Sequence, residues 1–144
     1  MTVAIRLAKV AAVVAVMFGL AVGPRPDAEA AGSGTAVSIT RFCGATSGSA
    51  ESATIKLSIT LKNLGPGDVQ GNFVAWSVAM APAVNPYFYL TTHGTVVLHP
   101  GQSVKFVASG TGINLARTTR FAAGVGNVYA YTPWYMSPQE IPAC

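Results

Sequence analysis

The feature that most constrains the fold is a strict alternation of apolar and polar residues between positions 55 and 62. The apolar members are Ile55, Leu57, Ile59 and Leu61, and the polar members are Lys56, Ser58, Thr60 and Lys62. A two-residue period places these two sets on opposite faces of a β-strand. The segment is therefore predicted to be a strand with one buried face and one solvated face, as in an antiparallel sheet.

Two further segments, 73–80 and 103–109, repeat this alternation. In the first, Val74, Trp76 and Val78 are predicted to face the core, and Trp76 is expected to pack inside it. Weaker strand patterns bring the total to about eight, and they are Val37–Cys43, Tyr87–Thr91, Thr95–His99, Thr118–Val125 and Val128–Thr132. No window after residue 30 sustains a helical period, so long helices are not expected.

Glycine and proline interrupt the chain between these strands. Residues 64–68 (Leu-Gly-Pro-Gly-Asp) cannot continue a strand ladder, and 99–102 (His-Pro-Gly-Gln) has proline then glycine at the centre of a type II turn. Asp68 is expected to cap its own loop, and Ser47–Ser52 is expected to be a flexible polar linker. The pattern predicts an all-β fold, an immunoglobulin-like antiparallel β-sandwich of about 7–8 strands.

The N-terminus has the layout of a secretory signal. Arg6 and Lys9 precede the uncharged run Val10–Gly23, and Ala28-Glu29-Ala30 provides an A-x-A cleavage site. Residues 1–30 are therefore predicted to be a signal peptide, and residues 31–144 a single domain. The prediction implies a secreted or cell-surface protein that is not in the membrane after cleavage.

Three other interpretations of the N-terminus fit the sequence less well. A membrane anchor needs about 18 apolar residues, whereas only fifteen uncharged positions separate Lys9 from Arg25. A lipoprotein is disfavoured because the residues before Cys43 lack the small apolar side chains of a lipobox. A pilin-type signal would be cut before the apolar run and retain it, but the residues around Lys9 match that processing site poorly.

Cys43 and Cys144 are the two cysteines of the chain. Export makes a disulfide between them the expected state, because thiols of exported proteins are usually oxidised. The alternative is free or intermolecular thiols, with Cys144 placed to cross-link subunits. Two cysteines without a C-x-x-C spacing do not form a structural zinc site.

Charge is scarce, since only 10% of the residues are charged. After residue 30 there are six Lys or Arg and three Asp or Glu, and the bases form no run. Nucleic-acid binding usually shows a basic patch, so a nucleic-acid partner is not predicted, and anionic cell-wall polymers are only weakly supported. His93 and His99 flank one short strand and would lie about 20 Å apart, so no metal or other cofactor is predicted.

The same scarcity argues against an enzyme. General acid–base and nucleophilic mechanisms need several titratable groups in one place, and Glu51 and Glu140 lie far apart in the sequence, in a polar linker and a proline-flanked tail. No G-x-S-x-G elbow is present, and no glycine-rich phosphate loop follows a strand. The chain is predicted not to be an enzyme.

Two motifs resemble the immunoglobulin-like surface modules of bacteria, of the cell-adhesion-related type. The segment 59–69 (ITLKNLGPGDV) is similar to their strand and Gly-Pro turn, and 98–106 (LHPGQSVKF) is similar to their L-x-P-G-x-S-V-x-F hairpin. Together the motifs span about half of residues 31–144. The resemblance implies an extracellular, adhesive or structural role, although the chain has one module and no tandem copies.

Exposed aromatic residues are the predicted interaction surface. Strand alternation sends Tyr87 and Tyr89 to one face and Phe88 to the other, and flat aromatic side chains can stack on sugars or anchor protein interfaces. Ordinary core and edge packing is the competing interpretation. The predicted binding residues are Tyr87, Tyr89, Tyr129, Tyr131, Trp134 and Tyr135.

Two functions are compatible with these observations. The first is an exported, non-enzymatic structural or adhesive protein, one form of which is a filament subunit whose segment Ala31–Phe42 pairs with an open edge of a neighbour. The second is a soluble secreted binding module or inhibitor that uses the tyrosine and tryptophan surface. The expected partner is a protein, including a second copy of the chain, or a polysaccharide.

Overall fold

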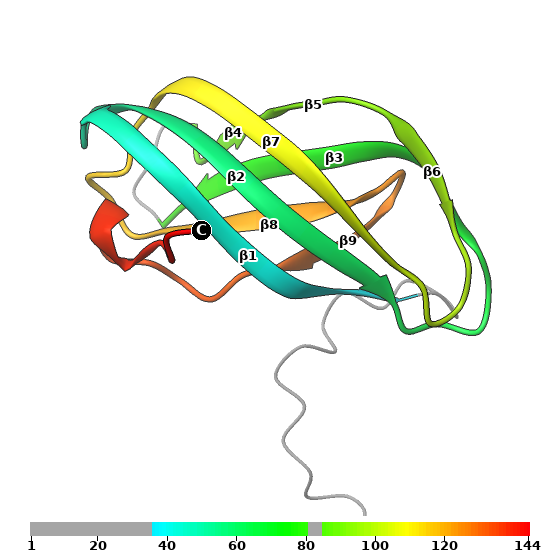
Figure 1. The fold of residues 1–144 in the computed structure, drawn as a ribbon. Helices are drawn as coiled ribbons and strands as arrows, with labels where there is room; N and C mark the ends of the chain where they lie inside the picture. The colour runs from blue at the N-terminus through cyan, green and yellow to red at the C-terminus, as the bar shows by residue number, and fades with distance from the viewer. Residues whose placement is uncertain (1–35, 81–84) are drawn as a thin grey trace, which may run out of the picture.

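The computed structural model describes residues 36–80 and 85–144, which form two antiparallel β-sheets packed face to face (Figure 1). The predicted signal peptide, residues 1–30, lies outside the described residues. The all-β architecture with two packed sheets is confirmed. Within the described residues, no helix is long and apolar enough to cross a membrane.

The first sheet has the strand order β1-β2-β7-β5. Its strands are β1 (Val37–Ser49), β2 (Ser52–Asn63), β7 (Ser103–Ile113) and the short β5 (Thr91–Thr92). The alternation predicted for β2 is confirmed, because Leu57, Ile59 and Leu61 are fully buried between the sheets. The polar residues of β2 lie on the outer face, next to those of β1 and β7.

The second sheet has the order β4-β3-β8-β9, and β6 pairs with the first half of β3. The strands are β3 (Val69–Ala79), β4 (Tyr87–Tyr89), β6 (Thr95–Leu98), β8 (Thr119–Val125) and β9 (Val128–Tyr131). Its inner face contributes Phe73, Phe121 and Ala123 to the core. Phe73 stacks on Phe106 of the first sheet with ring centroids 4.4 Å apart, so the two sheets are in direct contact.

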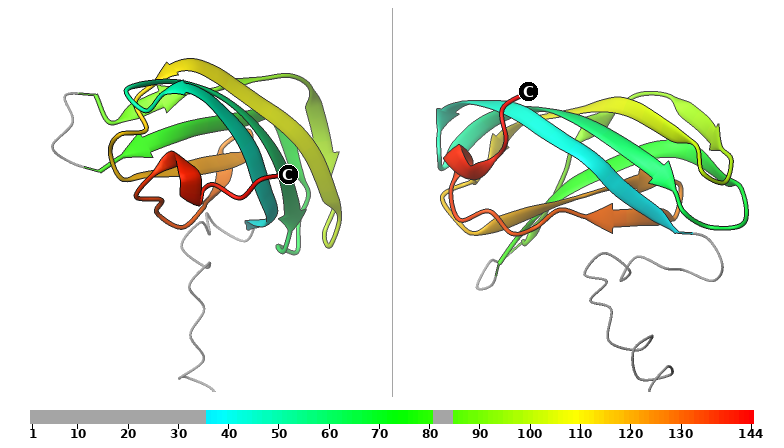
Figure 2. Two further views of the ribbon diagram at one scale, coloured as in Figure 1. Left: turned by 60° about the vertical axis from the view of Figure 1, so that its left-hand side comes forward. Right: turned by 60° about the horizontal axis from the view of Figure 1, so that its bottom comes forward.

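One segment of the chain connects the sheets along one side of the molecule. β4 and β6 pair with β3, whereas β5, between them in sequence, pairs with β7 of the other sheet (Figure 2). The Thr92 hydroxyl donates a hydrogen bond of 2.6 Å to the Phe73 carbonyl across the gap. This crossing limits the open edge of both sheets, which protects them from edge-to-edge pairing.

The C-terminal tail closes part of the opposite side. After the 3-10 turn η2 (Pro138–Glu140), the Pro142 carbonyl accepts a hydrogen bond of 2.8 Å from the Gly44 amide of β1. The predicted disulfide is present, and it joins Cys43 in β1 to Cys144. The tail therefore covers a stretch of β1 that would otherwise be a free edge.

Three local expectations were wrong, and the first two concern residues 47–52 and Trp76. Residues 47–52 form a tight hairpin between β1 and β2, with Ser49 paired to Ser52, rather than a flexible linker. Trp76 lies on the outer face of β3 and is half-buried, while Phe73 and Ala75 face the core. Both faces of this strand are apolar, so alternation alone could not tell which one is inside.

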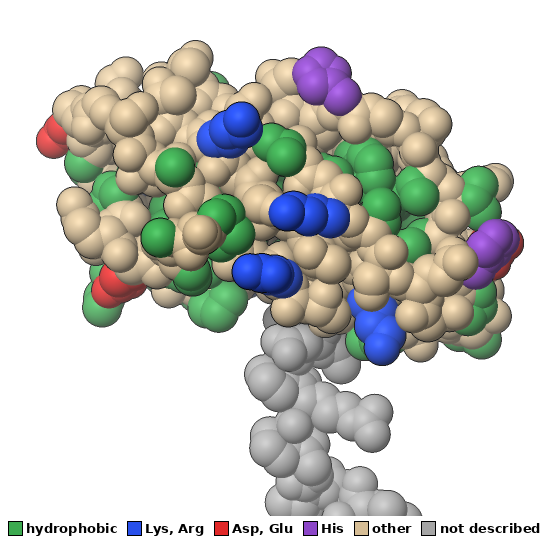
Figure 3. Space-filling model, viewed as in Figure 1, with side chains coloured by type: hydrophobic (Ala, Val, Ile, Leu, Met, Phe, Trp, Pro, Cys, Tyr) green, Lys and Arg blue, Asp and Glu red, His purple; other side chains and the backbone are tan. Residues whose placement is uncertain are grey.

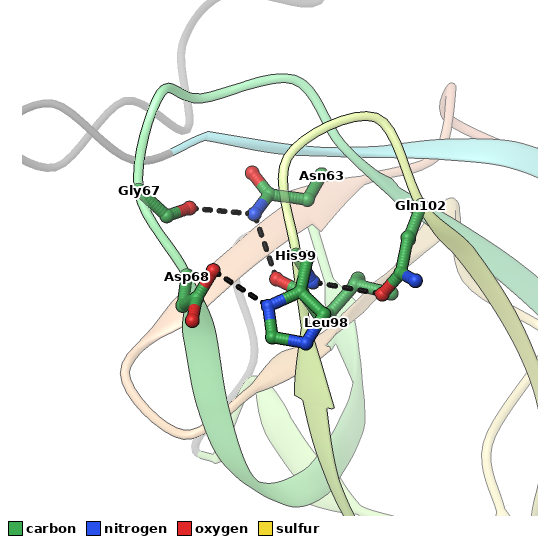
Figure 4. A network of polar contacts seen from close by, with 6 residues as sticks. All are labelled: Asn63, Gly67, Asp68, Leu98, His99 and Gln102. Atoms are coloured by element: carbon green, nitrogen blue, oxygen red, sulfur yellow. Dashed lines mark hydrogen bonds and ion pairs between the residues drawn. The ribbon is translucent and has the colours of Figure 1, made fainter.

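The buried side chain of Asn63 holds together the two loops that carry the sequence motifs (Figure 4). Its amide nitrogen donates to the carbonyls of Gly67 at 2.7 Å and Leu98 at 2.8 Å, and its amide oxygen accepts from the Gly65 amide at 2.9 Å. The capping role expected of Asp68 in its own loop thus belongs to Asn63, the last residue of β2.

The adjoining 99–102 turn has the predicted type II features. The Gln102 amide donates to the His99 carbonyl at 3.0 Å. Gly101 has a φ of 78°, in the left-handed region that the third residue of a type II turn requires. Gly101 also donates its amide to the Asn63 carbonyl at 2.8 Å, so the turn is fixed to the end of β2.

Candidate functional site

The outer surface of the second sheet carries a cluster of aromatic side chains, which we call the aromatic face. Register shows why they gather, because residues paired across antiparallel strands point to the same side of a sheet. Tyr89 is paired with Trp76, Trp76 with Ala122, and Ala122 with Tyr131. The aromatic face consists of Trp76, Tyr87, Tyr89, Tyr129, Tyr131 and Trp134, with Arg120 among them.

Small residues in β8 make room for these rings. Ala122 and Gly124 are the outward-facing partners of Trp76 and Val74, and Gly124 is also paired with Tyr129. A Cβ atom on Gly124 would overlap the Val128 carbonyl and lie 2.7 Å from the Tyr129 Cα. The large rings of β3 and β9 can therefore meet over a central strand that carries almost no side chain.

The rings contact one another mainly edge to face. Trp76 lies 4.9 Å from Tyr129 and 6.5 Å from Tyr131 between ring centroids, and the two tyrosines are 5.7 Å apart. These separations are in the range in which T-shaped aromatic pairs are favourable. A cleft of about 520 Å³ opens beside them, and Trp76, Tyr89, Tyr129 and Asn127 contribute to its lining.

Exposure separates the rings that fix the surface from those available to a partner. Tyr89 is 77% exposed and Tyr87 51%, both at the β4 edge of the sheet. Trp134 is 38% exposed at the other end. Trp76 and Tyr131 are half-buried beneath them. The central rings are thus held in place by packing, while the outer ones present their surfaces to solvent.

Arg120 is the cation of the aromatic face. Its guanidinium carbon lies 3.9 Å from the centroid of the Tyr131 ring and 4.7 Å from that of Trp134, so the group stacks against both rings. Its Nε atom is buried without a hydrogen-bond partner among the described residues. Burial is the main cause that raises the pKa of Tyr131, and the charge on Arg120 opposes that rise. The phenol therefore stays neutral at physiological pH.

Five of the six predicted binding residues belong to this surface, and the sixth does not. Tyr135 is half-buried on the side of the core, 5.9 Å from Phe42 and 6.2 Å from Phe121 between ring centroids. Burial raises the pKa of Tyr135 as well. Sequence reasoning missed Trp76 and Arg120, although Arg120 alternates with Phe121 in a strand that was predicted.

The histidine and acidic side chains of the described residues lie at separate places on the surface, apart from one pair. His99 Nδ1 lies 2.8 Å from Asp68 Oδ1, and both side chains are more than half exposed. His93 is exposed elsewhere on the surface, and Glu140 accepts a hydrogen bond from the Met136 amide. Residues 36–80 and 85–144 contain no group of three or more His, Cys, Asp or Glu that could hold a metal ion.

Comparison with known proteins finds no match for this chain among family models, curated proteins or solved structures.

Proposed function

We propose that this protein is an exported, non-enzymatic adhesive module that binds a protein partner through its aromatic face. The observation that carries the proposal is the gathering of five tyrosine and tryptophan residues and one arginine around Trp76 on one sheet surface. Tryptophan, tyrosine and arginine are the residue types that contribute most binding energy in protein interfaces. They are seldom collected on a surface that only meets water.

The arrangement of the rings also supports a protein partner. Interface anchors contribute most where they are held rigidly before binding, since less entropy is then lost. Trp76 and Tyr131 are fixed by ring contacts, and Arg120 is stacked between Tyr131 and Trp134. A protein side chain or loop that enters the neighbouring cleft would cover rings already in position. Stacking of a sugar on Tyr89 is the competing use of the same surface.

Export and the immunoglobulin-like class belong to this proposal. The basic start, apolar run and A-x-A site of residues 1–30 support export, and the Cys43–Cys144 disulfide is compatible with an oxidising compartment. Two packed antiparallel sheets with a segment that passes from one to the other are consistent with an immunoglobulin-like sandwich. The two motifs that resemble bacterial surface modules meet at Asn63.

Self-association is one form of the proposed function, and the strand pairing indicates which surface would mediate it. Donation of the segment Ala31–Phe42 to a neighbour requires that it be free, yet residues 37–42 are already paired with β2 of the same chain. A filament subunit of this kind would therefore be expected to use the aromatic face for its contacts between copies.

The proposal is tested by the adhesion of beads that carry the purified, disulfide-bonded protein, both to cells of the source organism and to one another. Tyr87→Ala, Tyr89→Ala and Trp134→Ala in one variant remove the exposed rings and are expected to reduce adhesion at least tenfold. The control variant, Leu64→Ala with Val107→Ala, removes exposed apolar side chains away from the aromatic face, since Leu64 is 61% and Val107 45% exposed.

Full adhesion of the aromatic variant would overturn the proposal, and so would an equal loss in the control. Treating the cells with a protease before the assay separates the two kinds of partner. Adhesion that survives proteolysis but is inhibited by soluble polysaccharide would show that the aromatic face binds a sugar and not a protein.

A further inference from the structure

The outer surface of the first sheet gathers four of the basic residues, and we call it the basic face. Arg41 in β1 and Lys105 in β7 are both paired with Thr60 of β2, so the three side chains point to the same side. Lys62 and Lys56 are on that side too, two and four residues from Thr60 along β2. Arg41, Lys56 and Lys105 are exposed and Lys62 is half-buried.

No acidic side chain lies among these cations. The acidic residues of the described chain are Glu51 in the β1–β2 turn, Asp68 beside His99, and Glu140 in the C-terminal tail. Figure 3 looks onto this face and shows Lys and Arg side chains spread over β1, β2 and β7, with acidic side chains only at the rim. Among the described residues, the four cations form no salt bridge.

The spacing of the charges follows from sheet geometry. Strands lie about 4.8 Å apart, so Arg41 and Lys105, on either side of Thr60, are about 10 Å apart at their Cα atoms. Lys62 is about 7 Å along the strand from Thr60, and Lys56 about 13 Å in the other direction. The positive charge thus forms a strip about 20 Å long that follows β2. Between the cations lie the hydroxyl side chains Ser58 and Thr60 of β2, and Ser58 is flanked by Val107 of β7 and by Cys43 of β1, which carries the disulfide.

We propose that the basic face binds a linear acidic polysaccharide, which lies along β2 with its carboxylates near Lys56, Arg41, Lys105 and Lys62. Four like charges held together with no acidic side chain of the described residues among them repel one another, and a polyanion that neutralises them is favoured by that relief and by counterion release. Serine and threonine hydroxyls can donate and accept hydrogen bonds with sugar hydroxyls along the same strip. A pocket of about 410 Å³ between Lys56, Ser58 and Val107 on the sheet and Ala143 and Cys144 of the C-terminal tail can receive part of a sugar ring.

The surface suits this partner better than other polyanions. Single-stranded nucleic acid is held by aromatic rings that stack on its bases, and the paired outward positions of β1, β2 and β7 carry none. A membrane surface is bound by basic residues together with inserted apolar side chains, whereas Val107 is the only large hydrophobic residue exposed on this face. The proposal concerns a surface on the opposite side of the molecule from the aromatic face and does not depend on it.

The experiment measures binding of the purified, disulfide-bonded protein to alginate, a polyuronate, by isothermal titration calorimetry, with neutral dextran as a reference. Binding is expected with alginate and not with dextran, and it should weaken roughly 10- to 100-fold between 50 and 200 mM salt if about four charges are neutralised. The variant Arg41→Gln, Lys62→Gln, Lys105→Gln is expected to lose at least tenfold in affinity at 50 mM salt.

A matched control changes the net charge equally but elsewhere. Gln70→Glu, Asn72→Asp and Gln139→Glu are isosteric changes at exposed positions away from the basic face, and they also lower the net charge by three. This control should keep most of the affinity. Equal losses in the two variants would overturn the proposal by showing that only net charge matters.

Further outcomes separate this proposal from its rivals and from the proposed function. Tighter binding of DNA or of phosphatidylglycerol vesicles than of alginate would overturn the assignment to a polysaccharide, as would no binding of alginate at 50 mM salt. Circular dichroism and thermal unfolding verify that each variant is folded. The Tyr87, Tyr89 and Trp134 variant should bind alginate normally, so the two proposals can fail independently.

Discussion

The two outer faces of the molecule differ in how their side chains are held. On the aromatic face, Trp76, Tyr129 and Tyr131 contact one another above the small residues of β8, and Arg120 stacks between two rings. On the basic face, Arg41, Lys56 and Lys105 are exposed and extend from the sheet beside serine and threonine side chains. The side chains of the aromatic face are packed against one another, whereas most of those on the basic face extend into solvent.

This difference matches the different modes of binding that we propose for the two faces. Packed rings lose little entropy when a partner covers them, so they favour a specific, short-range contact. Exposed lysines keep their freedom and act through charge at longer range, which favours a repetitive polyanion and is weakened by salt. A module with such faces on opposite sides could attach to an acidic polymer on one side and to a protein on the other.

The largest expected effect comes from removing the disulfide, which connects both faces. Cys43 lies in β1 of the first sheet, whose outer surface is the basic face, and Cys144 ends the tail that also carries Trp134. The bridge closes a sequence separation of 101 residues. In the chain-entropy model a loop of that length contributes up to about 4.7 kcal/mol. Cys43→Ala with Cys144→Ala is expected to lower the free energy of unfolding by about 4 kcal/mol, measured by urea denaturation.

Reduced wild-type protein is the control for that variant, and it should unfold at the same urea concentration. A loss below about 1 kcal/mol would show that the tail holds β1 without the covalent link, and that the two faces are joined by packing alone.

Gly124→Ala tests whether the aromatic face is as closely packed as its register implies. The added methyl group would overlap the Val128 carbonyl, so either β9 or the rings must move. We expect a loss of about 3 kcal/mol in the free energy of unfolding. The added methyl of Ser58→Thr on the basic face has room in the pocket beside it and should cost less than about 0.5 kcal/mol.

Similar costs for the two substitutions, measured by thermal unfolding, would contradict the contrast between a packed and an open face.

Asn63→Ala acts at the end of β2 in the first sheet, where the Asn63 side chain bonds to the loops that lead into β3 and out of β6 of the second sheet. It removes three hydrogen bonds in a buried site and leaves the Leu98 carbonyl without that donor. We expect a loss of about 2–3 kcal/mol in the free energy of unfolding. Both proposed binding activities should persist at temperatures where the variant remains folded.

Asn85→Ala is the matched control, because its exposed side chain accepts one hydrogen bond of 3.3 Å from the Tyr87 amide. It should cost less than about 0.5 kcal/mol. A comparable loss of unfolding free energy at Asn85 would mean that the buried hydrogen bonds of Asn63 contribute no more to stability than one exposed hydrogen bond.

The smallest effect expected is a dependence of stability on alkaline pH that originates in two half-buried tyrosines, Tyr131 of the aromatic face and Tyr135 beside the core. Burial raises the pKa of Tyr131 and Tyr135 above the ordinary value of 10.0, so the folded state favours the neutral phenols. Their contribution to stability is complete below pH 10 and is lost as the pH rises through their folded pKa values. Thermal unfolding between pH 8 and 12 should show a falling midpoint above pH 10.

The double variant Tyr131→Phe, Tyr135→Phe should show a smaller decrease over that range, because these phenols no longer ionise. An unchanged decrease would locate the alkaline sensitivity elsewhere. Ultraviolet absorbance of tyrosinate at each pH provides a direct titration of the same groups.

Much of the fold was predictable because its signals are local. The alternation in 55–62, the turn at 99–102 and the pairing of Cys43 with Cys144 all depend on residue type and spacing, and all are present in the structure. The assignment of Tyr87 and Tyr89 to the face opposite Phe88 follows from strand alternation in the same way.

The site was less predictable because it depends on which strands become neighbours. Trp76 was expected in the core, since Val74, Trp76 and Val78 are as apolar as Phe73 and Ala75. The stacking of Phe73 on Phe106 and the small side chains of Ala122 and Gly124 decide that the tryptophan is outside. These contacts join residues more than thirty positions apart in sequence, and no local pattern encodes them.

The sequence by itself determined that this chain forms strands with two distinct faces, where it turns, and which cysteines can join, because these properties follow from the two-residue period, backbone conformation and redox chemistry. Only the tertiary structure decided that four basic residues from three strands share one surface and that the aromatic residues share the opposite one. The physical reason is that strand alternation assigns each side chain to a face, whereas the register between strands, set by the packing of the whole core, determines its neighbours.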